Sequence, residues 1–249
     1  MMVTRWIGGV ALAVAMSTGV AAADRPRAVL ELYTSQGCSS CPPADTYLSE
    51  IADRTDVIAL TFAVDYWDYL GWKDTLADPA NGKRQKAYAA VRGDRQVYTP
   101  QMVVNGGAHV VGSDRQGIER AVSSSNGQHG AMTLPVTIEV KGDTVTIQLP
   151  AAANGIATAD TPAQVFLLGV VNRAPVTISR GENRGHTMVY RNVVRSMTPV
   201  GEWTGTAQSF TISRRDRIAA GCERAVVLVQ AGTARRPATV LGAAVAGLQ

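Results

Sequence analysis

The 249-residue sequence predicts an α/β domain followed by a mostly antiparallel, sandwich- or barrel-like β domain. From residue 27 to residue 125, short β-rich runs alternate with helical patterns, which is typical of a sheet covered by helices. Beyond residue 131, strand candidates follow one another without helices and are separated by Gly, Pro and Asn. We therefore expect an α/β domain over residues 24–126 and a β-rich domain over residues 131–249.

The first 23 residues have the layout of a secretory signal peptide. A lone positive charge at Arg5 precedes an apolar run, and the segment ends in three alanines at residues 21–23. Glycine, serine and threonine interrupt the run, which is already short of the roughly 20 apolar residues needed to span a bilayer. We expect cleavage near Ala23, a secreted or periplasmic mature protein, and no stable membrane anchor after cleavage.

The α/β domain is expected to begin with a strand at Ala28–Thr34, a helix from Pro42, and a strand at Asp56–Val64. Proline suits a first helical turn because its φ is fixed and no amide partner is needed there. A further helix is expected within residues 78–96. A hairpin with strands at 101–104 and 108–111 and a helix capped by Ser113 or Asp114 complete the domain.

The second domain opens with a hairpin around Gly142-Asp143, where apolar and polar residues alternate on both sides. Further strands are predicted at residues 163–172, 186–194, 208–213, 224–230 and 239–248. The net charge of +4 comes from scattered basic residues with no dense run. Such a pattern excludes a nucleic-acid partner as the main function.

Cys38 and Cys41 form a Cys-x-x-Cys pair between the first strand and its helix. A zinc site would need two more ligands, and only Cys222 and three separated histidines remain in the sequence. A static disulfide closing so short a loop would remove little entropy from the unfolded chain. A redox pair has a physical purpose here, because a helix N-terminus stabilises a thiolate and makes the first cysteine the attacking group.

The order of these elements resembles the thioredoxin fold, over roughly residues 27–125. In that fold a cis-proline before the third core strand faces the cysteine pair and helps to bind the substrate, and Thr99-Pro100 matches its position. The resemblance therefore implies a cis bond before Pro100 and a substrate-binding role for both residues. Two departures stand out: Gly37 replaces the tryptophan of better-known members, and Ser39-Ser40 replaces their intervening pair.

A closer resemblance covers both halves of the chain. The segments TSQGCSSCPPAD, DYWDYLGWKD, YTPQMVVNG and RGENRGHTMVYRNVV together are similar to an uncharacterised family of secreted bacterial proteins with a thioredoxin-like domain. This family brings no activity with it. The resemblance implies the fold and leaves the function to be argued from the residues.

Three other features carry alternatives. The aromatics Tyr66 and Trp67 either bury a long insertion or form a substrate-binding wall beside the cysteines, and burial is the commoner role of such rings. The segment RGENRGH, residues 180–186, reads as a tight turn in which Glu182 or Arg184 bonds across the loop. His109 and the two cysteines are ligands of the types that bind copper(I), so a copper(I) site is an alternative for the pair. Cys222 is expected to be a buried inert thiol.

The sequence as a whole predicts a thiol-disulfide oxidoreductase in which Cys38 attacks and Cys41 resolves the mixed disulfide. Its partner would be a client protein or a small thiol, and no cofactor is expected. The alternative is a non-enzymatic binding or assembly protein with a static disulfide or copper(I) at the pair. A redox potential below about −300 mV would favour the static bond.

Overall fold

The computed structural model describes residues 25–94, 96–152 and 156–248. The expected signal peptide at residues 1–23 lies outside the described residues. Among the helices of the described part, none has the length and apolar character needed to cross a membrane.

The first half of the chain contains the helices and strands that its sequence predicts, together with one short 3₁₀ helix that it does not. They are β1 (Ala28–Thr34), α1 (Pro42–Ile51), β2 (Val57–Ala63), the short η1 (Asp68–Leu70), α2 (Pro79–Arg92), β3 (Gln101–Val104), β4 (Ala108–Val111) and α3 (Arg115–Ser125). Asp114 caps α3, since its side chain accepts a hydrogen bond from the amide of Gly117. The predicted hairpin at residues 101–111 is confirmed, with Asn105 and Gly106 both at positive φ in its turn.

The second half differs from expectation in the length of its strands. It contains η2 (Gln128–Gly130), β5 (Thr137–Lys141), β6 (Thr144–Leu149), β7 (Ala163–Thr177), β8 (Thr187–Trp203), β9 (Gln208–Ser213), α4 (Arg214–Arg217), β10 (Arg224–Thr233) and β11 (Arg236–Gly247). Strands β7 and β8 are 15 and 17 residues long, and form a hairpin that reaches far beyond the short strands predicted.

Strands from both halves share one sheet. The order is β11-β10-β7-β8-β2-β1-β3-β4, while β5, β6 and β9 form a separate three-stranded sheet. The join between the halves is narrow, because β2 and β8 pair only at Thr61 and Val193. The second half is thus a β-rich region whose long strands continue the sheet of the first half.

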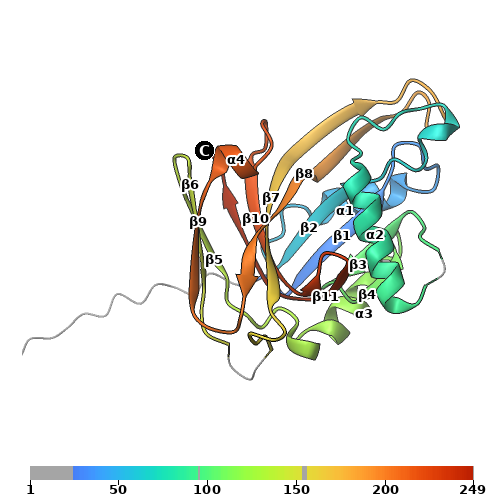
Figure 1. The fold of residues 1–249 in the computed structure, drawn as a ribbon. Coiled ribbons are helices and arrows are strands. Elements are labelled where there is room, and N and C mark those ends of the chain that lie inside the picture. The colour runs from blue at the N-terminus through green and yellow to red at the C-terminus, as the bar shows by residue number, and fades with distance from the viewer. Residues whose placement is uncertain (1–24, 95, 153–155, 249) are drawn as a thin grey trace, which may run out of the picture.

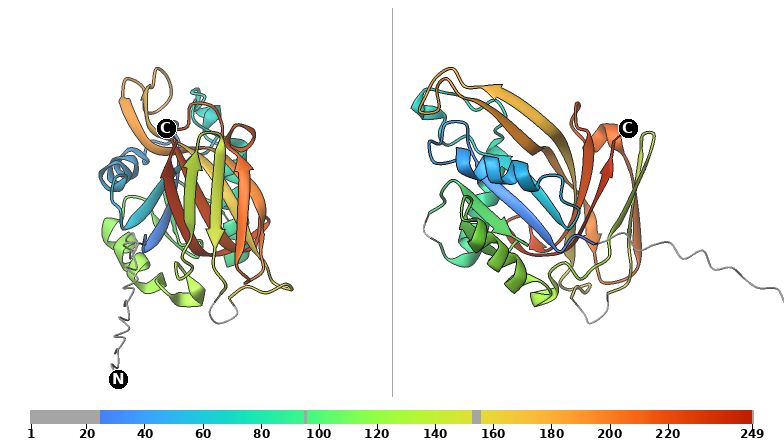
Figure 2. Two further views of the ribbon diagram at one scale, coloured as in Figure 1. Left: turned by 90° about the vertical axis from the view of Figure 1, so that its left-hand side faces the viewer. Right: turned by 180° about the vertical axis from the view of Figure 1, so that it is seen from behind.

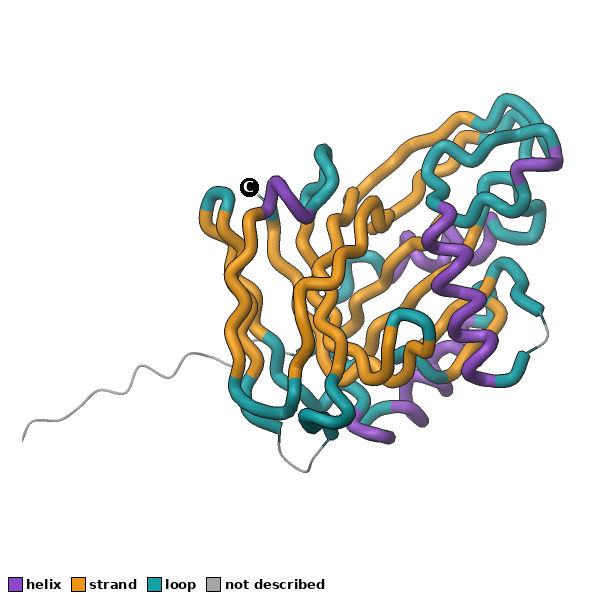
Figure 3. Tube along the Cα trace, in the orientation of Figure 1, coloured by secondary structure: helices purple, strands orange, loops and turns teal. Residues whose placement is uncertain are grey.

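Three apolar clusters hold these layers together (Figures 1 and 2). On one face of β1–β3, helices α1 and α3 bury Leu32, Leu48 and Ile118 with their neighbours. On the other face, Phe62 and Tyr88 pack with residues of β7, β10 and β11. The third cluster lies between the long strands and the small sheet, which stands at the left in Figure 1. Figure 3 shows the longer helices away from the small sheet, whereas the short α4 (Arg214–Arg217) lies beside it.

Strand β8 bonds to the last part of helix α1 and to the residues that follow it. The Ser49 hydroxyl donates to the carbonyl of Val189 at 3.3 Å. Past the end of the helix, Arg191 makes two bonds to the carboxylate of Asp53, and the Asn192 amide donates to the carbonyls of Ala52 and Ala59. The helix that begins beside the cysteine pair is therefore fixed by the second half of the chain.

Candidate functional site

The loop between β1 and α1 carries a disulfide between Cys38 and Cys41, whose Cα atoms lie 5.4 Å apart. Its backbone is tightly turned: the Cys38 amide donates to the carbonyl of Ser35, and the Cys41 amide donates to the carbonyl of Cys38. Ser39 and Ser40 between them are exposed. The loop therefore presents its two serines at the surface.

The two cysteine residues are largely covered in the disulfide form. Cys38 is 3% exposed and Cys41 is 0% exposed. The order agrees with the expectation that Cys38 is the more accessible residue, but the difference is small. A thiol that attacks this bond must approach by way of Cys38, because Cys41 has no exposed surface.

The start of α1 offers fewer free amides than a helix N-terminus usually does. Pro42 and Pro43 have no N–H, and the amides of Ala44 and Asp45 both donate to the carbonyl of Cys41. The sequence-based expectation that unpaired helix amides stabilise a Cys38 thiolate is thus weakened at the first two helical positions. Other polar groups near the loop must contribute if Cys38 is to be acidic.

Asp45 is a buried acid one helical turn after Cys41. It is 4% exposed, and neither of its carboxyl oxygens makes a hydrogen bond of regular geometry within the described residues; the same holds for the Thr34 hydroxyl. Burial raises the pKa of Asp45 to about 8 and is the largest cause of the shift. The nearby Thr34 hydroxyl lowers this pKa, and the negative charge of Asp74 raises it further. Residues four apart share one face of a helix, so Asp45 lies on the side of Cys41.

We expect an Asp45→Asn variant to gain stability over the wild type as the pH rises. The folded protein keeps Asp45 protonated up to a pKa of about 8, whereas an unfolded chain loses this proton near pH 4. The unfolding free energy of the wild type therefore decreases as the pH rises from about 4 to about 8. At pH 7 the loss from this group alone is roughly 4 kcal/mol. Urea unfolding of both proteins at several pH values measures the difference.

An Asp56→Asn variant is the control for Asp45. The neighbouring arginine Arg54 lowers the pKa of Asp56, so that its stabilising effect is present at neutral pH and lost in acid. Its pH trend should run opposite to that of Asp45→Asn. Parallel curves for wild type and Asp45→Asn would show that Asp45 is ionised in the folded protein.

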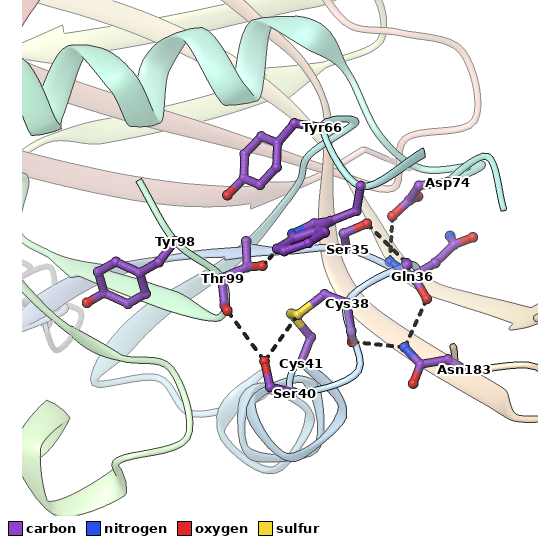
Figure 4. The surroundings of a disulfide bond; sticks show 12 residues. Ser35, Gln36, Cys38, Ser40, Cys41, Tyr66, Asp74, Tyr98, Thr99 and Asn183 are labelled. Atoms are coloured by element: carbon purple, nitrogen blue, oxygen red, sulfur yellow. Dashed lines mark hydrogen bonds between the residues drawn. A yellow bond between two sulfur atoms is a disulfide. The ribbon is translucent and has the colours of Figure 1, made fainter. Parts of the chain in front are cut away.

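The peptide bond between Thr99 and Pro100 is cis, as the resemblance implies. Figure 4 shows Thr99 facing the cysteine loop. The Ser40 hydroxyl lies 3.5 Å from both the Thr99 carbonyl oxygen and Cys38 Sγ, at the long limit for hydrogen bonds. The segment before β3 thus lies beside the exposed end of the pair.

The aromatic insertion after β2 also contacts the loop. Trp67 Nε1 donates to the Thr99 hydroxyl at 2.7 Å, and a Cβ atom on Gly37 would lie 3.2 Å from the Cβ of Trp67. Glycine at position 37 therefore leaves room for Trp67 to pack against the cysteine loop. Tyr66 bonds to Gln85 and is half-buried, whereas Tyr69 is 76% exposed and stacks on Trp67. Both roles considered for the insertion, packing and an aromatic wall, fit these contacts.

Two buried side chains that sequence reasoning missed hold the loop backbone. The Asp74 carboxylate accepts a hydrogen bond from the Gln36 amide at 2.8 Å. The Asn183 side-chain amide donates to the carbonyls of Gln36 and Cys38, at 2.9 Å each. Asn183 belongs to the segment predicted as a tight turn; Gly181 and Gly185 do adopt positive φ there, but Asn183 makes the contact where Glu182 or Arg184 was expected to bond.

The remaining candidates have other surroundings. His109 Nδ1 lies 3.0 Å from the Tyr98 hydroxyl and 3.1 Å from Gln101 Nε2. No cluster of three His, Cys, Asp or Glu side chains suited to a metal ion occurs among the residues that the structure describes, so the copper(I) set is not assembled there. Cys222 is a free thiol and only partly buried; this burial raises its pKa.

Comparison with known proteins finds one matching family model and two similar structures that cover most of the chain. The family model described as "Protein of unknown function (DUF1223)" matches residues 29–230. Protein AGR_C_4864 from Agrobacterium tumefaciens is 32% identical in sequence, with 89% of this chain and 94% of that chain covered and a TM-score of 0.77. HBP35 of Porphyromonas gingivalis is similar in fold alone, at 14% identity and a TM-score of 0.58 over 90% of this chain and 76% of that chain. No curated protein matches.

Proposed function

We propose that this chain, which belongs to the DUF1223 family, is a thiol-disulfide oxidoreductase with a thioredoxin-like domain that acts outside the cytoplasm. The observation that carries the proposal is the Cys38–Cys41 disulfide between a strand and a helix, with the buried acid Asp45 one turn behind it. Disulfides persist in oxidising compartments, which agrees with the secreted or periplasmic location expected from the N-terminus.

The topology supports the thioredoxin-like part of the proposal. Strands β1 and β2 are parallel, β1 and β3 are antiparallel, and β3 forms a hairpin with β4. Helices α1 and α3 cover the same face of this four-stranded part of the sheet. The segment from β2 to β3, with η1 and α2, is then an insertion that supplies Trp67 and Tyr66.

In the proposed reaction, a thiolate of a client protein or small thiol attacks Cys38 Sγ. The Cys38–Cys41 bond breaks, a mixed disulfide with Cys38 forms, and Cys41 leaves with the electron pair. Protonated Asp45 gives its proton to the Cys41 thiolate. A second client thiolate then attacks the client's own sulfur in the mixed disulfide, which oxidises the client and leaves Cys38 as a thiolate.

The same groups work in the reverse direction. Cys41 gives its proton to ionised Asp45 and attacks the mixed disulfide at Cys38, which releases the reduced client. A pKa of about 8 suits Asp45 to this exchange, because a thiol and an acid of similar pKa share a proton at low cost. We assign Thr99, Pro100, Trp67 and Tyr66 to the surface that holds the client beside Cys38.

A static disulfide is the second candidate, and the burial of both cysteines favours it. Equilibration with glutathione buffers separates the two functions. An oxidoreductase should show a potential between about −120 and −270 mV, whereas a structural bond lies below about −300 mV. The Cys222→Ser background keeps the free thiol out of the measurement, and a value below −300 mV would remove the proposed function.

A further inference from the structure

The tip of the β7–β8 hairpin reaches the cysteine loop from the other half of the chain. In Figure 1 the hairpin extends to the upper right, where it meets the segment between β2 and α2. Asn183 at this tip is 5% exposed and bonds to the carbonyl of Cys38, a residue 145 positions earlier in the sequence. Figure 4 shows its amide directed at the loop backbone.

The hairpin is built to hold Asn183 at this place. The strands pair up to Thr177 and Thr187, and backbone bonds from Gly185 to Ile178 and from Ile178 to His186 close the loop. A Cβ on Gly181 would lie 3.1 Å from the Cβ of Trp72, so the tip packs directly against the insertion. Since β8 is also fixed to α1, the hairpin and the cysteine helix form one unit.

The contact has an electrostatic consequence for Cys38. An amide that donates to the Cys38 carbonyl neutralises part of the negative end of that dipole and places a positive end beside the residue. The first two positions of α1 cannot do this, because both are proline. The Asn183 amide therefore supplies polarity of the kind that a helix N-terminus supplies when its amides are free.

We propose that Asn183 is a positioning residue through which the second half of the chain sets the reactivity of Cys38. This proposal rests on the proposed function, because it concerns the same pair of cysteines. Asn183 orients the loop and favours the Cys38 thiolate. Its side chain donates a hydrogen bond to the carbonyl of Cys38 and takes no part in the covalent steps of thiol-disulfide exchange.

The test compares Asn183→Asp with Arg184→Gln, both in the Cys222→Ser background. Both substitutions lower the net charge by one, but Arg184 is exposed and its side chain makes no hydrogen bond within the described residues. The readouts are the thiol pKa of Cys38, from alkylation of the reduced protein against pH, and the glutathione equilibrium.

For Asn183→Asp, we expect the equilibrium to move at least about tenfold toward the disulfide, a change of about 30 mV to a more negative potential, together with a higher thiol pKa. Arg184→Gln should change the equilibrium less than about twofold, since exposed charges are screened. Asn183→Ala removes both donated hydrogen bonds without adding charge, and should shift the equilibrium about fivefold in the same direction. It carries the test if the Asp variant does not fold.

A lower melting temperature with an unchanged thiol pKa and potential in both Asn183 variants would show a structural bond only and overturn the proposal. A wild-type potential below about −300 mV that still shifts in Asn183→Asp would leave the positioning role standing, although the proposed function would fail. Equal shifts of the glutathione equilibrium in Asn183→Asp and Arg184→Gln would show a general charge effect. That result would also overturn the positioning role of Asn183.

Discussion

The Cys41→Ala variant is expected to accumulate mixed disulfides, whereas Cys38→Ala is expected to react slowly with the same thiols and disulfides. Without Cys41, the second step of exchange has no attacking group, and the adduct at Cys38 persists. In Cys38→Ala the remaining Cys41 is 0% exposed and lies on the same helical face as a buried acid. Burial raises a thiol pKa and limits access.

Alkylation against pH, with mass spectrometry of adducts formed with oxidised glutathione, measures this asymmetry. We expect Cys38 to react at least about tenfold faster than Cys41 at neutral pH, because one pKa unit changes the thiolate fraction tenfold. Both variants are made in the Cys222→Ser background. Equal rates, with both thiol pKa values near 8.5, would instead identify the pair as an ordinary structural disulfide.

The local parts of this site can be read from the sequence because short-range chemistry determines them. Pro42 begins a helix, Asn105 and Gly106 turn a hairpin, and Asp114 caps α3, and each of these effects acts within a few residues. The position of the cysteine pair follows from the same rules. The acid at Asp45 also left a signal, since it interrupts an apolar helical face next to Tyr47 and Leu48.

The long-range parts could not be read in this way. Nothing near Asn183 indicates that its amide meets Cys38, because the contact depends on how far the β7–β8 hairpin extends. The single residue pair, Thr61 and Val193, through which β2 and β8 share a sheet has no sequence pattern of its own. Strand periodicity predicts that such strands exist, but not which sheet they join.

The Arg84→Met variant is expected to lose about 3 to 5 kcal/mol of unfolding free energy, because it leaves a buried carboxylate without its cation. Arg84 makes two bonds to Glu31, at 2.7 and 2.8 Å, and the Glu31 side chain is fully buried. The hydroxyls of Tyr33 and Tyr88 also donate to this carboxylate. They cannot replace the charge of the guanidinium.

This cluster links the two halves, which is why its loss should affect the whole protein. Glu31 lies on β1, Arg84 on α2, and Arg84 also donates to the side-chain oxygen of Gln230 on β10 at 3.0 Å. Unfolding should therefore remain one transition with a lower midpoint. Separate loss of the β-rich region would show that, without the cluster, the narrow join at β2–β8 does not couple the two halves.

The exposed pair of Arg115 and Glu50 provides a matched control for Arg84→Met. Arg115 also makes two bonds to a glutamate and lies over a tyrosine ring, but the two side chains are 53% and 47% exposed. Arg115→Met should lower the unfolding free energy far less than Arg84→Met does, because water solvates the glutamate that remains. Urea unfolding of both variants decides the point: similar small losses would mean that the protein relaxes around Glu31 and admits water.

The double variant Glu31→Leu with Arg84→Met should lose less unfolding free energy than Arg84→Met alone. The Glu31→Leu substitution removes the unpaired charge and leaves only polar hydroxyls to satisfy.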